Sequence, residues 1–136
     1  MRLLQSKRWI SSVEISKITG YVGKDLEQAI ATLKARGLPL ECQPERGCRL
    51  MTSVRLIDEC RLSQYLRNAG LISATRVSVV DAVDSTNSRL LDWTDPFTVH
   101  GRVCIAEYQS SGRGRRGRPW FAAGYQNLTL SLAWKM

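Results

Sequence analysis

The chain has 136 residues, 43% of them hydrophobic, and its 20 basic residues outnumber the 12 acidic ones to give a formal net charge of +8. This composition predicts one globular domain or two small ones. No apolar run approaches the roughly 20 residues that cross a bilayer, and the N-terminal residues lack the pattern of a secretory signal, so we expect a cytoplasmic protein. One histidine and four widely spaced cysteines argue against a zinc site, so we expect no metal and reduced thiols. The basic surplus favours partners that carry phosphate.

The first predicted elements form a helix-turn-helix. Ser11 or Ser12 can cap a short helix that ends at Gly20, where a left-handed turn is typical. A longer helix, from about Val22 to Arg36, follows from an apolar stripe with helical spacing. The stripe consists of Val22, Leu26, Ile30 and Leu33. A short helix, a tight turn and a longer helix are typical of DNA-binding proteins.

A turn signal at residues 44–47, between two short extended runs, predicts a hairpin after the second helix. Such a hairpin is a wing, so residues 1–51 are predicted to form a winged helix-turn-helix domain. The residues expected to face DNA are Lys24, Gln28, Arg46 and Arg49. Asp25 and Glu27 lie on the same half of the helix and repel phosphates. The alternative is therefore a winged helix that contacts protein or has lost DNA binding.

A connecting helix and a strand come next. Asp58 can cap a helix that closes at Gly70, and residues 52–70 are predicted to connect two domains. Residues 76–83 are mostly apolar on both sides, which indicates a largely buried strand. This strand is the first element of the second domain.

Four consecutive residues of the kind that cap helices follow this strand: Asp84, Ser85, Thr86 and Asn87. They open a helix that runs through Leu90 to Trp93, and one helix needs fewer capping groups than these four supply. Their hydroxyl and amide groups can therefore meet a ligand at the start of the helix. Ordinary capping is the simpler explanation of the same residues.

A basic, glycine-rich loop lies between two predicted strands. A buried strand over residues 102–107 precedes it, and an alternating run over residues 128–134 follows it. Its residues are Gly112, Arg113, Gly114, Arg115, Arg116, Gly117 and Arg118. Glycines let backbone N–H groups curve around an anion, and guanidinium groups suit phosphate oxygens. Because strands anchor both ends, a small phosphate-bearing ligand is favoured over a role as a disordered RNA-binding segment.

These residues resemble the bifunctional biotin protein ligase and biotin operon repressor family. The similarity rests on the loop of residues 112–118 with Trp120 after it, on Gln109 before it, and on the Asp-Ser-Thr-Asn string at residues 84–87. The two ligase motifs are specific in their order and spacing, whereas the DNA-binding half matches by pattern. With the winged helix in front, the resemblance covers the whole chain.

The resemblance implies an α+β fold. A winged helix-turn-helix over residues 1–51 would precede the first part of a mixed β-sheet biotin ligase catalytic domain, residues 71–136. It also implies that biotin and ATP, with Mg²⁺, give biotinyl-5′-AMP, and that the biotinyl group passes to a lysine of biotin carboxyl carrier protein. Operator DNA is the second implied partner, and a homodimer is implied for the intact family.

The resemblance also assigns site residues by position. The implied biotin-binding residues are Ser85, Thr86, Asn87, Gln109, Gly112, Arg113, Gly114 and Arg115. The implied adenylate-binding residues are Arg115, Arg116, Arg118 and Trp120. Arg115 and Arg118 are the expected catalytic groups, because adenylation develops charge on phosphoryl oxygens that guanidinium groups stabilise.

The chain departs from the family pattern in two places. Pro119 stands where a polar or basic residue is common, and its fixed backbone stiffens the end of the loop. A Lys-Trp-Pro-Asn-Asp-like motif and a small C-terminal domain do not follow, and Lys135 has the wrong surroundings to replace the motif's lysine. We therefore expect a truncated chain without full catalysis. The alternative function is a DNA-binding regulator in which only the winged helix is active.

Overall fold

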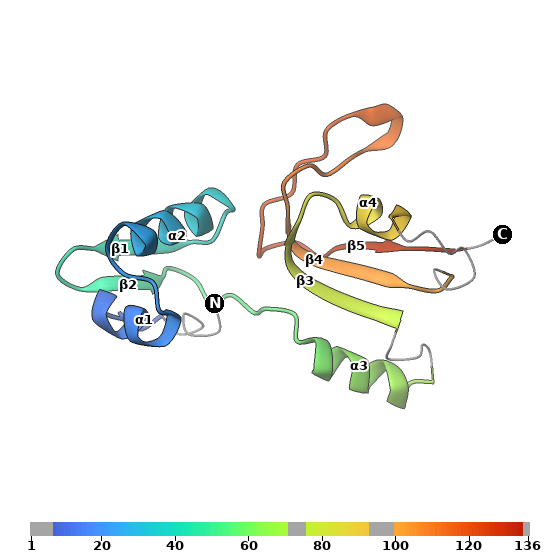
Figure 1. The fold of residues 1–136 in the computed structure, drawn as a ribbon. Helices are drawn as coiled ribbons and strands as arrows, with labels where there is room; N and C mark the ends of the chain where they lie inside the picture. Colours follow the sequence, from blue (N-terminus) through green and yellow to red (C-terminus); the bar gives the residue numbers. More distant parts are fainter. Residues whose placement is uncertain (1–6, 71–75, 93–99, 135–136) are drawn as a thin grey trace. The chain divides into compact units, whose positions relative to one another are not determined.

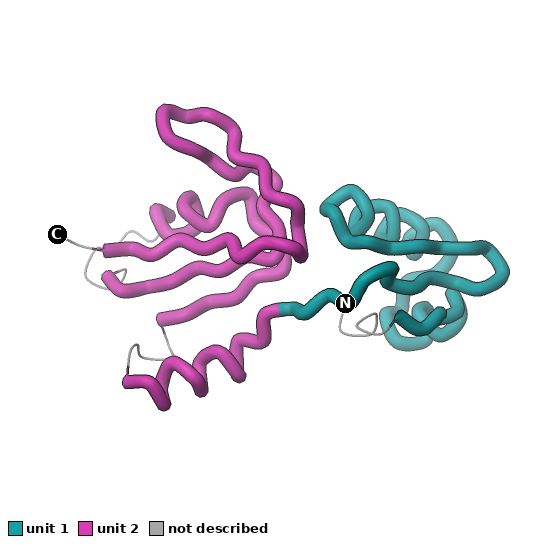
Figure 2. The backbone as a smooth tube through the Cα atoms, turned by 180° about the vertical axis from the view of Figure 1, so that it is seen from behind, with its two compact units in different colours: residues 1–56 teal, residues 57–136 magenta. Residues whose placement is uncertain are grey.

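The chain forms two compact units, residues 1–56 and 57–136, which Figure 2 shows in different colours. The computed structural model describes residues 7–70, 76–92 and 100–134. Each unit buries apolar side chains of its own. Within the described ranges, no helix is both long enough and apolar enough to span a membrane.

The first unit contains two helices followed by a two-stranded hairpin (Figure 1). Its elements are α1 (Ser12–Thr19), α2 (Gly23–Ala35), β1 (Leu40–Gln43) and β2 (Gly47–Leu50). Helix α1 begins where Ser11 Oγ accepts the amide hydrogen of Glu14, and it ends at Gly20, whose φ of 79° lies in the left-handed region. Strands β1 and β2 pair antiparallel. The helices and the hairpin lie where the sequence predicts them.

Ile10 ties the start of the chain to the hairpin. Its N–H and C=O exchange hydrogen bonds with the C=O and N–H of Cys48, both at 2.9 Å. Gly47 precedes this contact with a φ of +85°, and a Cβ atom there would overlap the Ile10 carbonyl oxygen, so only glycine fits. The core that results consists of Ile10, Ile15, Leu26, Leu38, Leu40, Cys48, Leu50 and Val54.

Cys42 and Cys48 form a disulfide across the hairpin. The expectation of reduced thiols was therefore wrong for these two residues. The cause is the register of the hairpin, which places the two cysteines directly opposite each other with their Cα atoms 4.1 Å apart. Cys60 and Cys104 carry free thiols.

The second unit is a three-stranded sheet with two helices. Its elements are α3 (Glu59–Asn68), β3 (Val77–Val83), α4 (Thr86–Leu91), β4 (Val103–Gln109) and β5 (Thr129–Leu132). The strand order is β3-β4-β5, with β3 parallel to β4 and β4 antiparallel to β5. Helix α4 packs against β4 and β5, and α3 lies along β3 on the other side of the sheet (Figure 1). An α+β protein with a mixed sheet is thus confirmed. Trp93, the predicted end of the helix after β3, lies outside the described residues.

Two carboxylates attach α3 and the segment before it to the sheet. Glu107 Oε1 accepts the Ile57 amide hydrogen at 2.5 Å, and Glu59 Oε2 accepts that of Val79 at 3.2 Å. Glu107 is buried, so its partner offsets part of the cost of removing the carboxylate from water. These bonds hold α3 on one face of the sheet.

Strand β5 alternates as the sequence predicts, although it is shorter than residues 128–134. Leu130 and Leu132 are exposed, whereas Thr129 and Ser131 are half-buried. Period-two alternation places Thr129 and Ser131 on the opposite face from the leucines. That polar face forms part of a cavity.

Candidate functional site

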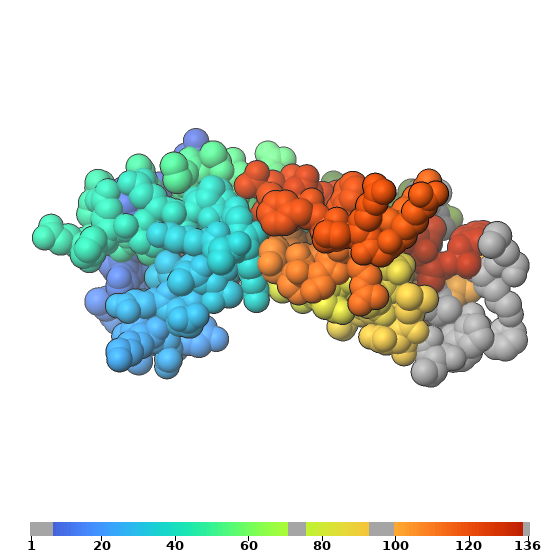
Figure 3. Space-filling view, turned by 90° about the horizontal axis from the view of Figure 1, so that it is seen from above, coloured from blue at the N-terminus to red at the C-terminus, as the bar shows by residue number. Residues whose placement is uncertain are grey.

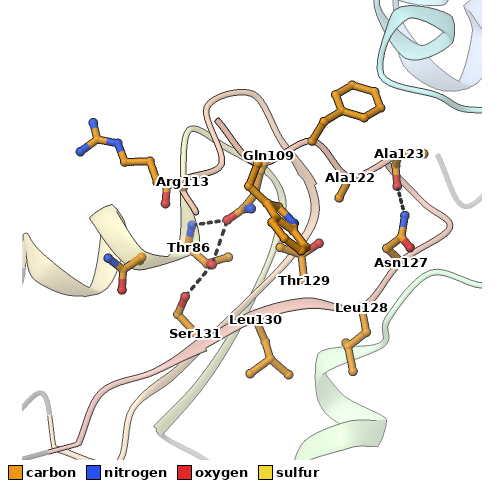
Figure 4. A pocket seen from close by; sticks show the side chains of 14 residues that line it. Thr86, Gln109, Arg113, Ala122, Ala123, Asn127, Leu128, Thr129, Leu130 and Ser131 are labelled. Atoms are coloured by element: carbon orange, nitrogen blue, oxygen red, sulfur yellow. Dashed lines mark hydrogen bonds between the residues drawn. The ribbon is translucent and has the colours of Figure 1, made fainter. Parts of the chain in front are cut away.

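A cavity of about 480 Å³ lies among the start of α4, the end of β4, the basic loop and β5 (Figure 4). It brings together six of the residues that the sequence singled out: Ser85, Thr86, Asn87, Gln109, Arg113 and Trp120. Residues 121–123 and 127–131 complete its lining. These walls combine hydroxyl and amide groups with apolar surface, as small-molecule sites do.

Two backbone hydrogen bonds hold the residues just before the basic loop beside the turn that opens α4. Ser110 N–H donates to Val83 O at 3.0 Å, and Ser111 N–H donates to Asp84 O at 2.8 Å. These bonds continue the parallel pairing of β3 and β4, in which Val83 lies opposite Gln109. The sheet register therefore brings the Asp-Ser-Thr-Asn string and the basic loop to the same cavity.

Thr86 and Gln109 are joined by two hydrogen bonds within the cavity (Figure 4). Gln109 Oε1 accepts the Thr86 amide hydrogen at 2.6 Å and the Thr86 hydroxyl hydrogen at 2.9 Å. Thr86 Oγ1 also lies 2.8 Å from Ser131 Oγ on β5. These hydrogen bonds link α4, β4 and β5 at Thr86, which is itself buried.

Ser85 caps α4, because its Oγ accepts the Ser88 amide hydrogen at 3.4 Å. Its side chain is buried at the edge of the cavity, so capping and lining are both roles of this residue. Asn87 is exposed and lines the cavity from the first turn of α4. The structure thus contains the capping that the sequence suggested and leaves Thr86 for the bonds to Gln109.

The basic loop folds back on itself as a narrow hairpin. Trp120 N–H donates to Gly112 O at 2.8 Å, and Gly114 N–H donates to Arg118 O at 2.7 Å. Pro119 pairs with Arg113 between these two bonds, at a position where no N–H is required, so its missing donor costs nothing. Gly112 is buried where the two sides of the loop meet.

The other three loop arginines stand away from the cavity. Arg115 and Arg116 belong to the short 3-10 turn η3 (Arg115–Gly117), where Arg116 has a φ of 61°, and Arg118 follows it. All three are exposed, and Figure 3 shows the loop on the surface of the second unit. The residues that the resemblance assigns to the adenylate are therefore divided, with Trp120 at the cavity and the three arginines at the exposed turn.

Several residues of the cavity were not singled out from the sequence. Asn127 Nδ2 donates to Ala123 O at 2.8 Å and shapes the segment before β5. Thr129 and Ser131 line the cavity from β5 itself. The signal that could have identified these two is their polar character on alternate positions of an otherwise leucine-rich strand.

In the first unit, the predicted DNA-facing residues have different surroundings. Lys24 and Gln28 are exposed on α2, as are Asp25 and Glu27. The guanidinium carbons of Arg46 and Arg49 lie 4.5 and 4.7 Å from the centre of the Trp9 ring. The two arginines of the hairpin are thus held against an indole ring.

Arg49 is also engaged by Glu41 on the neighbouring strand. Arg49 Nε donates to Glu41 Oε2 at 2.8 Å, and a second guanidinium nitrogen lies 2.7 Å from the same oxygen. The hydrogen bond from Arg49 holds the pKa of the Glu41 carboxyl below its usual value. Arg46, by contrast, is exposed at the tip of the hairpin.

Comparisons with known proteins point to one family. Residues 79–136 match the model of the biotin/lipoate A/B protein ligase family. Over 134 residues, 98% of this chain, the sequence is 33% identical to the bifunctional ligase/repressor BirA of Salmonella typhimurium and 32% identical to that of Escherichia coli. Over 77 residues, 56% of this chain and 29% of the relative, it is 38% identical to a biotin–[acetyl-CoA-carboxylase] ligase of Mycobacterium tuberculosis. The chain spans 40% of the length of the two bifunctional relatives.

Proposed function

This chain belongs to the biotin ligase/repressor family, and on that premise we propose that its cavity binds biotin and biotinyl-5′-AMP. The observation that carries the proposal is the position of the basic loop, because Ser110 and Ser111, just before it, are hydrogen-bonded to the end of β3 and the turn that opens α4. The proposed reaction joins biotin to ATP with release of pyrophosphate. The biotinyl group then passes to a lysine of biotin carboxyl carrier protein.

The neutral polar groups of the cavity suit the cyclic urea of biotin. Ser85, Thr86, Asn87 and Gln109 supply hydroxyl and amide groups, and apolar residues around them exclude water. Gly112 and Gly114 supply backbone groups of the loop. Arg113 is the loop arginine that already lines the cavity, and we assign it to the biotin side.

The exposed arginines of the loop are assigned to the phosphate. Arg115, Arg116 and Arg118 would reach it when the loop closes over the ligand, and Arg115 and Arg118 would stabilise charge on the phosphoryl oxygens. Trp120 lines the cavity and is assigned to the adenine side. Closure of the loop would also exclude water from a hydrolysable mixed anhydride.

Mg²⁺ would accompany ATP through the phosphate oxygens. The described part of the chain contains no group of three or more His, Cys, Asp or Glu residues that could hold a metal ion. These residues therefore do not fit a metal site of the protein's own, and no step is assigned to one.

Calorimetry with biotin and with a non-hydrolysable biotinyl-adenylate analogue tests the assignment. Arg115→Ala should weaken binding of the adenylate analogue about tenfold and binding of biotin by less, because biotin brings no phosphate to that side chain. Arg61→Ala, which removes an exposed arginine of α3, is the matched control. If a folded sample gives no binding heat with biotin and none with the adenylate analogue, the proposal is contradicted.

We further propose that residues 1–51 form a winged helix-turn-helix that binds operator DNA, with residues 52–70 as the connection and residues 71–136 as ligase domain. Two helices, a hairpin and the exposed Lys24, Gln28 and Arg46 support it. A role in DNA binding alone is not favoured, because the family model matches residues 79–136. Operator DNA and a second copy of the chain are the proposed partners.

DNA binding is tested by its dependence on salt. Lys24→Ala should reduce the slope of log affinity against log salt by about one unit, since one phosphate contact is lost. Lys34→Ala, at the other end of α2, serves as the control. Unchanged slopes after removal of both Lys24 and Arg46 contradict the proposed interface.

A further inference from the structure

We propose that Ser131 is a positioning residue of the cavity, which holds the Thr86 hydroxyl and, through it, the side-chain amide of Gln109 in one orientation. The inference rests on the proposed function, because it concerns how the same cavity selects its ligand. Ser131 lies on β5, and its Oγ is 2.8 Å from Thr86 Oγ1. Figure 4 shows Ser131, Thr86 and Gln109 in line, each from a different element.

The orientation of Gln109 follows from the Thr86 backbone. An N–H group donates only to an acceptor, and the side-chain amide nitrogen of glutamine is a donor. The atom that lies 2.6 Å from the Thr86 amide nitrogen is therefore the Gln109 carbonyl oxygen. The same oxygen accepts the Thr86 hydroxyl hydrogen at 2.9 Å.

The direction of the remaining bond follows from the number of hydrogens. The Thr86 hydroxyl has one hydrogen, and the bond to Gln109 uses it. Thr86 Oγ1 can therefore only accept from its other partner, so Ser131 donates to Thr86. The hydrogen bonds are therefore all donated in one direction, from Ser131 to Thr86 and from Thr86 to Gln109.

Ser131 is well placed to hold this chain rigidly. Its position is set by the pairing of β5 with β4, where it lies opposite Cys104, a residue with 0% exposure. Loss of the Ser131 hydroxyl would release the Thr86 hydroxyl to rotate away from Gln109. The Gln109 amide would then be held by the Thr86 backbone alone.

The consequence is a defined polarity at the cavity. Because Thr86 holds the oxygen of the Gln109 amide, Gln109 offers its Nε2 hydrogens to a ligand. That nitrogen lies close to Gly112, where an added Cβ atom would be 3.0 Å from it. A hydrogen-bond donor at this place suits the carbonyl oxygen of a cyclic urea and opposes a ligand that presents N–H groups there.

Binding of biotin and of 2-iminobiotin tests the proposal. At neutral pH the imino analogue carries a protonated guanidine in place of the urea carbonyl, so it presents donors to Gln109. Wild type should prefer biotin. Ser131→Ala should weaken biotin about fivefold and narrow the preference over 2-iminobiotin by a similar factor, since the Gln109 amide is then less constrained. Ser131→Thr, which retains a hydroxyl, should keep the wild-type affinity for biotin and the wild-type preference over 2-iminobiotin.

Ser78→Ala, which removes a serine on β3 outside the cavity, is the control and should leave both affinities unchanged. An equal loss of both ligands in Ser131→Ala would indicate a packing defect and would overturn the proposal. An unchanged biotin affinity in that variant would overturn it as well.

A second measurement separates this proposal from the proposed function. If wild type binds neither ligand, the proposed function fails. The hydrogen bonds among Ser131, Thr86 and Gln109 can still be tested in the free protein. Amide hydrogen exchange at Thr86 should accelerate about tenfold in Ser131→Ala, because its acceptor on Gln109 is less well held. Exchange at the same rate in both proteins would overturn the positioning role of Ser131.

Discussion

At Gly112 the two sides of the basic loop approach so closely that a side chain has no room. A Cβ atom there would lie 2.6 Å from Trp120 O and 3.0 Å from Gln109 Nε2. Gly112→Ala should therefore open the loop at a cost of about 2 kcal/mol, and trypsin should cleave after the loop arginines faster than in wild type.

Gly114→Ala is the matched comparison for this prediction. Its added Cβ atom would meet Arg118 O at 3.4 Å, an ordinary contact, and Gly114 has an extended backbone that alanine adopts. Trypsin should cleave the loop of Gly114→Ala at the same rate as that of wild type. Equal cleavage of the two variants would contradict the steric argument.

The four cysteines should differ in their reactivity. Burial raises the pKa of the Cys104 thiol, so little thiolate forms, and the residue has 0% exposure. Iodoacetamide at about pH 8 should label Cys60 in the folded protein and Cys104 only after unfolding. Cys42 and Cys48 should require reduction first. Peptide mass spectrometry measures each site, and rapid labelling of Cys104 in the native state would contradict the prediction.

Individual side chains show how far the sequence could predict the candidate site. The Asp-Ser-Thr-Asn string and the basic loop were predicted to share a ligand, and both reach one cavity. Ser131 was not predicted, because its bond to Thr86 spans 45 positions and depends on the pairing of β5. The bond between Arg49 and Glu41 was not predicted either, because it depends on the hairpin register that places the two residues opposite each other. Such contacts arise from pairing, which local patterns do not contain.

At the level of the hairpin, Glu41 gives a pH dependence with a definite sign. Its folded-state pKa is lowered, so its contribution to stability is fully present above the unfolded-state pKa and is lost as pH falls through the folded-state pKa. Glu41→Gln should therefore melt below wild type at neutral pH, and the difference should shrink on acidification from about pH 6 to about pH 3. Calorimetric melting temperatures measure it.

The partner of this carboxylate provides the control. Arg49→Gln should lower the melting temperature at neutral pH as Glu41→Gln does, because Glu41 is then left without its main hydrogen bond. A difference between wild type and Glu41→Gln that stays constant over the whole pH range would contradict the assignment.

Secondary structure was largely predictable where the signal is local. Helix α2 follows from an apolar stripe, α1 ends at a left-handed glycine, and β5 follows from strict alternation. The order of the strands was not predictable, because the parallel pairing of β3 with β4 depends on how α4 packs back onto the sheet. The disulfide of the hairpin was missed for the same reason, since it requires the register.

Over the whole chain, each unit buries a separate apolar core, so we expect the two to lose stability separately. Leu50 is 2% exposed in the core of residues 1–56. Leu50→Ala should destabilise that unit by about 3 kcal/mol and leave residues 57–136 unaffected. Hydrogen exchange followed by mass spectrometry reports each unit by its own peptides. Ile105→Ala should destabilise residues 57–136 and leave residues 1–56 unaffected. Loss of stability in both units from either substitution would contradict the prediction.

Trp9 contacts two guanidinium groups of the β1-β2 hairpin and is the sole tryptophan among residues 1–56. An arginine that turns toward a phosphate must leave the indole ring. With phenylalanine at the other three tryptophan positions, the fluorescence emission of this residue would report on the hairpin. Nucleic acid arriving at the hairpin would then be visible as a change in colour and intensity, with no added label.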